Sequence, residues 1–368
     1  MRFPEDVPLL SDGVVTLRPH REDDLQAIVD QSRDEETARW TGIPSPYTLD
    51  DAKRYVREFA PAGWTLGNAH EFAIEVDGRF AGSCALRDYG HRRAEVGYTV
   101  HPAQRGRGLM ERALRLLVGW AFETGRFDAL VWYAYPGNWA SRRVAWKLGF
   151  SCHGPLEDWQ PQRGALQDSW AGVLRKTDPR EPRQPWYDAP RILGANIALR
   201  PIVKSDGERI EEALNDPVSQ QWLRVPADLD VQAYVEERRE LMASGRVVYW
   251  TMADPDSDVL LGAVMLFDIE PGVDAEVGYW THPAARGRGV TTEACRLAVR
   301  HAFVPTEDGG MGLNRVTAYA GVDNAASLRV LENVGFSRYG VERLGGGNGR
   351  GERFDLVCHD LMAEEWSG

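Results

Sequence analysis

The stretch HPAQRGRGL at residues 101–109 returns almost unchanged as HPAARGRGV at residues 282–290. The repeat extends far beyond these nine residues. Other matched segments keep the same order along the chain: AEVGY at 94–98 and 275–279, and Asn-x-x-Ser at Asn138 to Ser141 and Asn324 to Ser327. A repeat this long that occurs only twice indicates two copies of a whole domain, because solenoid repeats are much shorter and more numerous.

The length and composition of the chain also favour two domains. It has 368 residues, of which 43% are hydrophobic, and single hydrophobic cores rarely grow beyond about 250 residues. Between the copies, prolines and charged residues crowd a segment that cannot easily form helix or sheet. We therefore expect an N-terminal domain over residues 1–177, a Pro-rich linker over 178–189 and a C-terminal domain over 190–368.

Several classes of protein are disfavoured by composition. The four cysteines are widely spaced, without a CxxC pair or a histidine at ligand spacing, so we expect neither a disulfide framework nor a metal site. No secretory signal or membrane-spanning apolar run is visible, which predicts a cytoplasmic protein without a membrane partner. The net charge of −12 argues against a nucleic-acid partner. It suits a cationic acceptor, or simply an acidic surface that keeps the protein soluble.

Each copy shows the same order of expected elements. A short strand is followed by helical stretches (49–60 and 230–243), then by apolar strands that end in the segments 94–100 and 275–281. After each RGRG loop, residues 110–123 and 291–303 space their apolar side chains as an amphipathic helix does. A further strand and a helix capped by Asn138 or Asn324 follow. Each domain is thus expected to be an α+β unit in which a central strand leads into a loop and a helix.

The RGRG loop has the features of an anion-binding site. A Gly-rich turn that opens a helix points several backbone N–H groups in one direction, at the positive end of the helix dipole. The glycines lack the β-carbons that would keep a pyrophosphate away from the backbone, and the arginines can donate to phosphate oxygens. The residues concerned are Arg105, Gly106, Arg107 and Gly108 in the first copy, and Arg286, Gly287, Arg288 and Gly289 in the second.

Two common phosphate-binding motifs do not fit these loops. No Lys-Ser or Lys-Thr follows the glycines, as a Walker A loop requires, and position 111 or 292 is not the third glycine of a Rossmann GxGxxG motif. An ordinary Gly-rich turn with exposed arginines remains the alternative for either loop taken alone.

The pattern resembles the Gcn5-related N-acetyltransferase (GNAT) family, whose pyrophosphate loop has the form Q/R-x-x-G-x-G/A. Arg105 with Gly108, and Arg286 with Gly289, match its first two fixed positions, whereas Met110 and Thr291 replace the small third residue. With the Asn-x-x-Ser helices, both halves look most like the ribosomal-protein N-terminal acetyltransferase branch (RimJ/RimL-like). The resemblance covers nearly the whole of both halves.

The resemblance implies a fold, a donor and an acceptor class. Each domain would contain a mixed, mostly antiparallel sheet flanked by helices, and acetyl-CoA would lie where two parallel strands splay apart. By position, residues 96–100 would face 131–134, and residues 277–281 would face 316–320. The acceptor would be a primary amine of a peptide N-terminus or a small molecule. Besides the loop residues, the implied cofactor contacts are Val100, Met110, Asn138, Thr291 and Asn324.

Four residues are candidates for catalysis. Ser141 and Ser327 lie in the first turn of the capped helices, where their hydroxyls could protonate the departing thiolate or merely support the helix start. Glu95 and Glu276 stand near the start of the splayed strand, where they could accept the proton of the amine or serve as solvated edge charges. Asn138 and Asn324 could likewise act only as helix caps.

Other repeated residues have a structural interpretation that is at least as good. Tyr98 and Tyr279 suit a core position on a central strand. His101 and His282, each followed by proline at the loop, suit a structural role or a cofactor contact better than a role as catalytic base. The acceptor site is expected from the variable segments around 40–47, 222–229 and 345–354. One alternative function is an acyl-CoA-binding regulatory or scaffold protein with inactive domains. The chain could act as a monomer with an internal pseudo-dimer, or as a homodimer.

Overall fold

The computed structural model describes residues 3–4, 6–124, 126–223 and 230–367. The chain divides into two compact units, Met1–Arg183 and Gln184–Gly368. Residues at the junction belong to one unit or the other: Arg183 donates through Nε to the Gly149 carbonyl at 2.7 Å, whereas Ala189 is buried in the core of the second unit. The domain limits at 177 and 190 stay a prediction.

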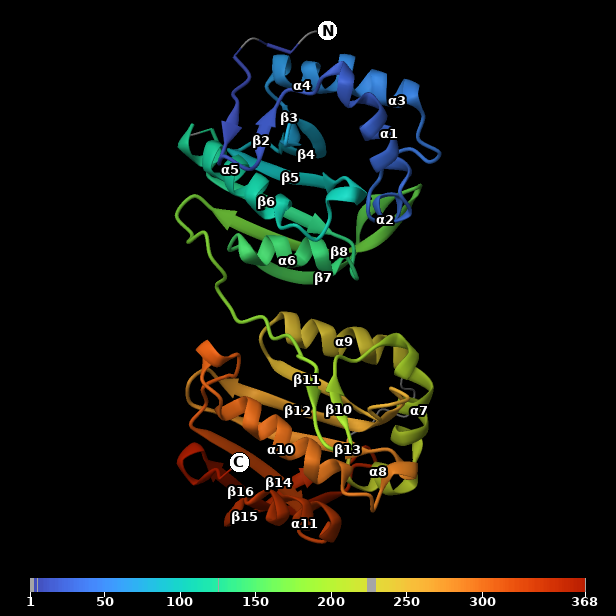
Figure 1. The fold of residues 1–368 in the computed structure, drawn as a ribbon, viewed down its shortest axis with the longest axis vertical. Coiled ribbons are helices and arrows are strands. Elements are labelled where there is room, and N and C mark those ends of the chain that lie inside the picture. The colour runs from blue at the N-terminus through green and yellow to red at the C-terminus, as the bar shows by residue number, and fades with distance from the viewer. Residues whose placement is uncertain (1–2, 5, 125, 224–229, 368) are drawn as a thin grey trace. The chain divides into compact units, whose positions relative to one another are not determined.

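The first unit is built on an eight-stranded sheet in the order β1-β2-β3-β4-β5-β6-β8-β7 (Figure 1). Its strands are β1 Leu10–Ser11, β2 Thr16–Arg18, β3 Ala69–Val76, β4 Arg79–Asp88, β5 Arg93–Val100, β6 Ala129–Ala134, β7 Ser151–Gln162 and β8 Ala165–Arg175. Its helices are α1 Leu25–Arg33, α2 Glu35–Trp40, α3 Leu49–Arg54, α4 Ala60–Leu66, α5 Leu109–Glu123 and α6 Trp139–Lys147. Shorter helical turns are η1 Glu22–Asp24 and η3 Pro102–Gln104, and a π-helical turn, η2 Tyr55–Phe59, joins α3 to α4.

The second unit repeats this plan with the order β15-β16-β14-β13-β12-β11-β10-β9. Its strands are β9 Ile192–Leu193, β10 Ala198–Arg200, β11 Val247–Ala253, β12 Leu260–Glu270, β13 Asp274–Thr281, β14 Arg315–Gly321, β15 Ser337–Gly347 and β16 Arg353–Met362. Its helices are α7 Gly207–Asn215, α8 Pro217–Trp222, α9 Val231–Ala243, α10 Val290–Phe303 and α11 Ala325–Val334, with turns η4 Lys204–Asp206, η5 Pro283–Ala285, η6 Thr306–Asp308 and η7 Ala363–Glu365. The predicted α+β tandem architecture is confirmed.

One strand pair in each sheet is parallel, and it is short. β5 pairs with β6 only at Arg93–Ala129, Ala94–Leu130 and Glu95–Val131, although both strands continue. β13 and β14 likewise pair only from Asp274–Arg315 to Glu276–Thr317. The predicted splay therefore exists in both units. The splay starts slightly further along the strands than expected, because Val131, Val316 and Thr317 still form parallel pairs.

The two faces of the first sheet pack against different helices. On one face, α5 buries Leu114 and Leu117 against strand residues such as Phe72 and Trp132. On the opposite face, α1, α3 and η2 form a smaller cluster with Ala73 and Phe80, among them Val56. Because side chains alternate along a strand, odd-numbered β3 residues face this second side.

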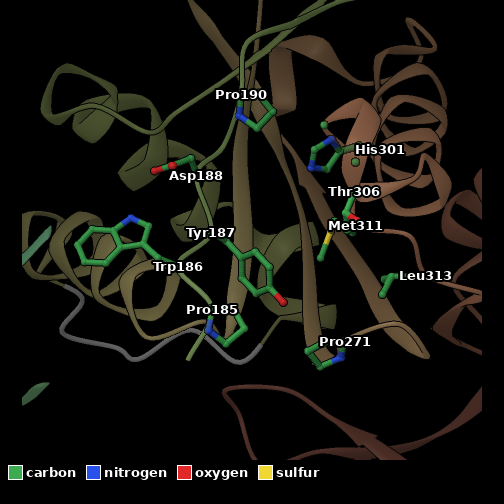
Figure 2. A pocket seen from close by; sticks show the side chains of 12 residues that line it. Pro185, Trp186, Tyr187, Asp188, Pro190, Pro271, His301, Thr306, Met311 and Leu313 are labelled. Carbon is green, nitrogen blue, oxygen red and sulfur yellow. The ribbon is translucent and has the colours of Figure 1, made fainter. Parts of the chain in front are cut away.

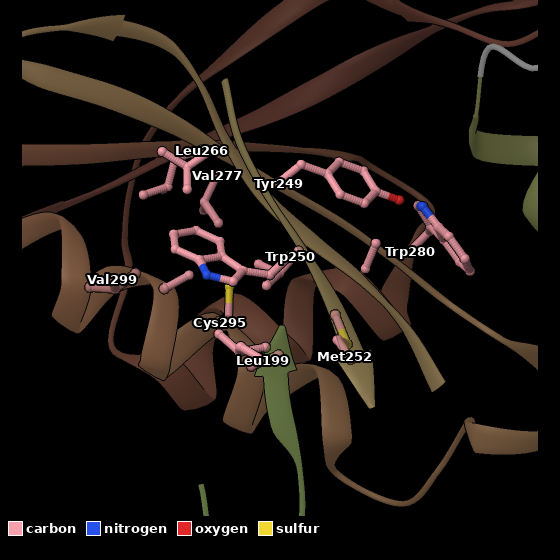
Figure 3. Close-up of a cluster of buried hydrophobic side chains, with 14 of the residues drawn as sticks. Leu199, Tyr249, Trp250, Met252, Leu266, Val277, Trp280, Cys295 and Val299 are labelled. Atoms are coloured by element: carbon pink, nitrogen blue, oxygen red, sulfur yellow. The ribbon is translucent and has the colours of Figure 1, made fainter. Parts of the chain in front are cut away.

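The core of the second unit is continuous. Trp250 is fully buried on β11, and its indole Nε1 donates to the Pro190 carbonyl at 3.0 Å. Figure 3 shows its ring near Leu199 and Cys295, while Tyr249 and Trp280 point away from that cluster. Strand residues such as Trp250 therefore pack on the side of α10, and residues such as Tyr249 point to the opposite face of the sheet.

Burial of Leu117 predicts a specific loss of stability. Leu117→Ala should lower the free energy of unfolding by about 2–5 kcal/mol, because it removes a fully buried side chain and leaves a cavity. Urea unfolding of the full chain measures it. Leu66→Ala, at a side chain that is 74% exposed, is the matched control and should change the free energy by no more than about 0.5 kcal/mol. Equal effects of the two changes would contradict the described core.

Candidate active site

A large cleft lies at the mouth of the splayed strands in the first unit. Its volume is about 950 Å³. Most of the site residues predicted for the first unit line it, namely Glu95, Val100, Arg105, Met110, Asn138 and Ser141, whereas Gly106, Arg107 and Gly108 do not. The cleft extends to α1, α2 and the segment 40–47, so the expected cofactor and acceptor regions open into one space.

The RGRG loops hold their glycines in the left-handed region. Gly106 and Gly108 have φ of 75° and 70°, and Gly287 and Gly289 have φ of 74° and 76°. A β-carbon at any of these positions would have no described atom within 4 Å apart from its chain neighbours. The glycines are thus required by the backbone conformation, and the space above them suits a phosphate group approaching the N–H groups at the start of α5 or α10.

The two arginines that match the family loop are engaged in ion pairs. Arg105 contacts Asp34 and donates to the Thr37 hydroxyl at 3.0 Å. Arg286 repeats this with Asp216 at 2.5 Å and the Ser219 hydroxyl at 3.0 Å. Asp34 and Asp216 also cap α2 and α8. These arginines therefore connect the loops to α2 and α8. Arg107 and Arg288 lie outside these ion pairs and are exposed.

The third position of the loop motif is apolar in the first unit and polar in the second. Met110 is buried in the core and, like Val100, lines the cleft. The corresponding Thr291 hydroxyl lies 2.5 Å from that of Thr281. An apolar pair in the first unit thus becomes a hydrogen-bonded pair in the second.

Each candidate serine is held by a tyrosine from the splayed strand. The Tyr98 hydroxyl lies 2.8 Å from Ser141 Oγ, and Trp132 Nε1 donates to the same oxygen at 3.0 Å. In the second unit, Tyr279 lies 2.9 Å from Ser327 Oγ. Burial raises the pKa of both tyrosines, so their hydroxyls stay protonated. The sequence interpretation of Tyr98 and Tyr279 as core residues missed this contact, although their repetition within AEVGY was the available signal.

The asparagines act as helix caps. Asn138 Oδ1 accepts from the Ser141 amide at 3.2 Å, and Asn324 Oδ1 accepts from the Ser327 amide at 3.1 Å. His282 has a structural role as well: its Nδ1 lies 3.0 Å from an Arg209 nitrogen and its Nε2 lies 2.9 Å from a Glu212 oxygen. His101 accepts at Nδ1 from the Ala103 amide.

Comparison with known proteins gives the family. The model of the acetyltransferase (GNAT) domain matches residues 15–151 and again residues 196–337, which together exceed half of the chain. The chain belongs to the GNAT acetyltransferase family. The predicted tandem arrangement of two such domains is confirmed.

Two curated relatives from Bacillus subtilis (strain 168) align with about one domain each. The protein named "Putative ribosomal N-acetyltransferase YdaF" is 29% identical over 187 residues, 48% of this chain and 96% of its own length. The one named "Probable N-acetyltransferase YjcK" is 30% identical over 161 residues, 41% of this chain and 86% of its own. Among solved structures, Mycobacterium smegmatis RimJ in complex with CoA-disulfide is 22% identical, covers 47% of this chain and 90% of its own, and has a TM-score of 0.42.

The glutamates of the two GNAT domains have different surroundings. Glu95 lies 3.8 Å from the Arg87 guanidinium and accepts a hydrogen bond from Tyr89. At the position opposite Glu276, the pairing of β12 with β13 places Phe267 instead of an arginine. Burial, with Asp268 and Glu342 nearby, raises the pKa of Glu276 to about 7. Glu276 is therefore suited to accept a proton near neutral pH.

A smaller hollow of about 440 Å³ lies elsewhere on the second unit (Figure 2). The segment 185–190 forms one side, and His301, Met311 and Leu313 lie across from it. None of the predicted site residues lines it. Over the described ranges, no helix has the length and apolarity to cross a membrane, and no cluster of three His, Cys, Asp or Glu side chains is arranged for a metal ion. Residues 224–229 of the expected acceptor segment lie outside the described residues.

The contrast between Arg87 and Phe267 predicts a shift in the titration of Glu276. Phe267→Arg should lower the pKa of Glu276 from about 7 toward the ordinary range, because a nearby guanidinium favours the ionised carboxyl. NMR titration of ¹³C-labelled glutamate carboxyls measures this. Val259→Arg, at a position that is 41% exposed, is the control for added charge. A Glu276 pKa that stays near 7 in Phe267→Arg would contradict the placement of position 267 beside the Glu276 carboxyl.

Proposed function

We propose that each GNAT domain transfers an acetyl group from acetyl-CoA to a primary amine of a peptide N-terminus or a small molecule. One observation carries the proposal: in both domains a tyrosine–serine hydroxyl pair and a glutamate flank the mouth of the splayed strands. The name of the YdaF relative, a ribosomal N-acetyltransferase, supports a protein or peptide acceptor. The proposal includes domain limits of 1–177 and 190–368 and a cytoplasmic location.

The residues expected to hold the cofactor follow from the cleft and the loops. Backbone N–H groups at Gly106 to Met110 and Gly287 to Thr291 would bind the phosphates, with Arg107 and Arg288 adding charge. Strand residues beyond Glu95 and Glu276 have lost their parallel partners, and their backbone groups would bind the pantetheine amides. Asn138 and Asn324, besides capping, position the serines at this groove.

The catalytic roles follow from the same arrangement. The bound donor supplies a thioester carbonyl carbon and a sulfur leaving group. The neutral amine attacks that carbon, so that the C–N bond forms and the C–S bond breaks. Glu95 or Glu276 takes the proton that the amine loses, and the Tyr98–Ser141 or Tyr279–Ser327 hydroxyl pair gives a proton to the departing sulfur. Transfer of a proton from the glutamate through water to the hydroxyl pair restores both groups, and the sum is an acetylated amine and a free thiol.

Acetyl transfer by the second domain should depend on the ionisation of Glu276. Since a protonated carboxyl cannot accept a proton, this activity, expressed per neutral acceptor amine, should rise with pH through about 7 and level off above it. Glu276→Gln should remove this pH dependence and lower the acetyl-transfer rate of the second domain by about 10²-fold or more. Initial rates of CoA release with acetyl-CoA and a panel of peptides, polyamines and amino sugars, taken from pH 5.5 to 9, measure both effects.

Two controls separate the roles in this experiment. Asp268→Asn removes one of the charges that raise the pKa of Glu276, so it should move the midpoint to lower pH and keep the plateau. Combined changes of both serines and both glutamates should abolish transfer while acetyl-CoA binding persists. Absence of CoA release with every acceptor would refute the proposed function.

A further inference from the structure

The cleft of the first domain contains a buried polar atom that no described residue satisfies. Gln31, on α1, lines the cleft and is only 5% exposed, yet its Oε1 accepts no hydrogen bond from the part of the chain that the structure describes. A buried acceptor is costly unless something donates to it. Because Gln31 lines the acceptor side of the cleft together with Trp40 and Tyr47, an N–H group of a ligand in that cleft can supply the donor.

Glu71 adds a carboxylate to the same cleft. It lies on β3, and the Tyr55 hydroxyl donates to its Oε2 at 2.9 Å. Tyr55 in turn lies 3.3 Å from His20 Nε2, and burial lowers the pKa of His20 to about 4, so this histidine is neutral. The Arg87 guanidinium is 4.0 Å from Glu71 and also serves Glu95. The Arg87 guanidinium therefore faces two carboxylates. Although this guanidinium lowers the pKa of Glu71, burial raises it more.

The second domain has lost these groups at the equivalent positions. Strand register matches Glu71 to Tyr249, because they pair with Ala85 and Met265 on the next strand. It matches Arg87 to Phe267, which pair with Glu95 and Glu276. Gln31 precedes the capping Asp34 by three residues, as Ala213 precedes Asp216.

Aromatic side chains occupy corresponding positions in the second domain. Tyr249 is fully buried, and Trp280, which replaces Thr99, is 6% exposed. Figure 3 shows the two rings beside each other. Phe267 lies across Gly278, where a β-carbon would be 2.8 Å from its ring. Next to Glu276, the second domain thus presents the partly exposed ring of Phe267, without the amide of Gln31 or the carboxylate of Glu71.

We propose that the two domains divide acceptors by charge: the first recognises a second cationic group on the acceptor through Gln31 Oε1 and Glu71, and the second takes amines with an apolar neighbour. This inference rests on the proposed function. Both first-domain groups accept hydrogen bonds, and an ammonium group is the ligand that satisfies two acceptors and compensates the carboxylate. A site built to bond such a group discriminates strongly against acceptors that lack it.

The test uses the full chain, acetyl-CoA and three peptides of equal length with a free N-terminal alanine. They differ only at the second residue, which is Lys, Leu or Glu. Glu71→Gln removes the charge with little change in shape, and Gln31→Leu removes the acceptor at nearly constant volume. Each should lower the ratio of kcat/KM for the Lys peptide to that for the Leu peptide by at least about tenfold. Glu58→Gln, the same change at an exposed site on η2, should leave the ratio unaltered.

A measurement on the unaltered protein does not depend on any variant folding. Raising the salt concentration should lower kcat/KM for the Lys peptide more than for the Leu peptide, because salt screens a charge pair and not an apolar contact. If both variants left the Lys-to-Leu ratio intact, or if the Glu peptide were preferred, the inference would be overturned while the proposed function stood. If no CoA were released from acetyl-CoA with any of the three peptides or the other amines, the proposed function itself would fail.

Discussion

The site depends on the early end of one strand pairing. β5 and β6 share three parallel residue pairs and then diverge, as do β13 and β14. The divergence leaves backbone groups on a central strand without a sheet partner, a state that strands normally avoid. It also lets the capped ends of α6 and α11 bring Ser141 and Ser327 to the hydroxyls of Tyr98 and Tyr279. The groove between the strands and the hydroxyl pair that is the candidate acid thus both depend on the early end of the parallel pairing.

Around this shared groove the two domains have kept the backbone and changed the side chains. Loop glycines, capping asparagines and the loop-to-helix ion pairs recur almost unaltered. The face proposed to receive the acceptor does not recur: Phe267 stands in place of Arg87, and Tyr249 stands in place of Glu71. The two copies have therefore preserved the residues proposed to bind the cofactor, while the proposed acceptor surfaces are chemically distinct.

Much of this could be predicted from the sequence, because the decisive features are local. A Gly-rich loop before an amphipathic helix and an asparagine at a helix start can each be recognised from a few neighbouring residues, and both features occur in each copy. Features made by side chains from distant strands were not predicted. The ion pair of Arg105 with Asp34, the Tyr98–Ser141 contact and the joint presence of Gln31 and Glu71 in one cleft depend on strand register and helix placement. The hairpins β7–β8 and β15–β16 were missed as well, since their first strands, β7 and β15, carry many exposed residues and lack a clear apolar alternation.

The most direct test of two intact cofactor grooves is calorimetric titration of the full chain with acetyl-CoA. The account predicts two sites per chain, one of which is lost in Gly108→Glu and the other in Gly289→Glu, because each places a carboxylate where phosphates are expected. A single site in the unaltered chain would show that one groove does not bind the donor. No binding would contradict the account as a whole.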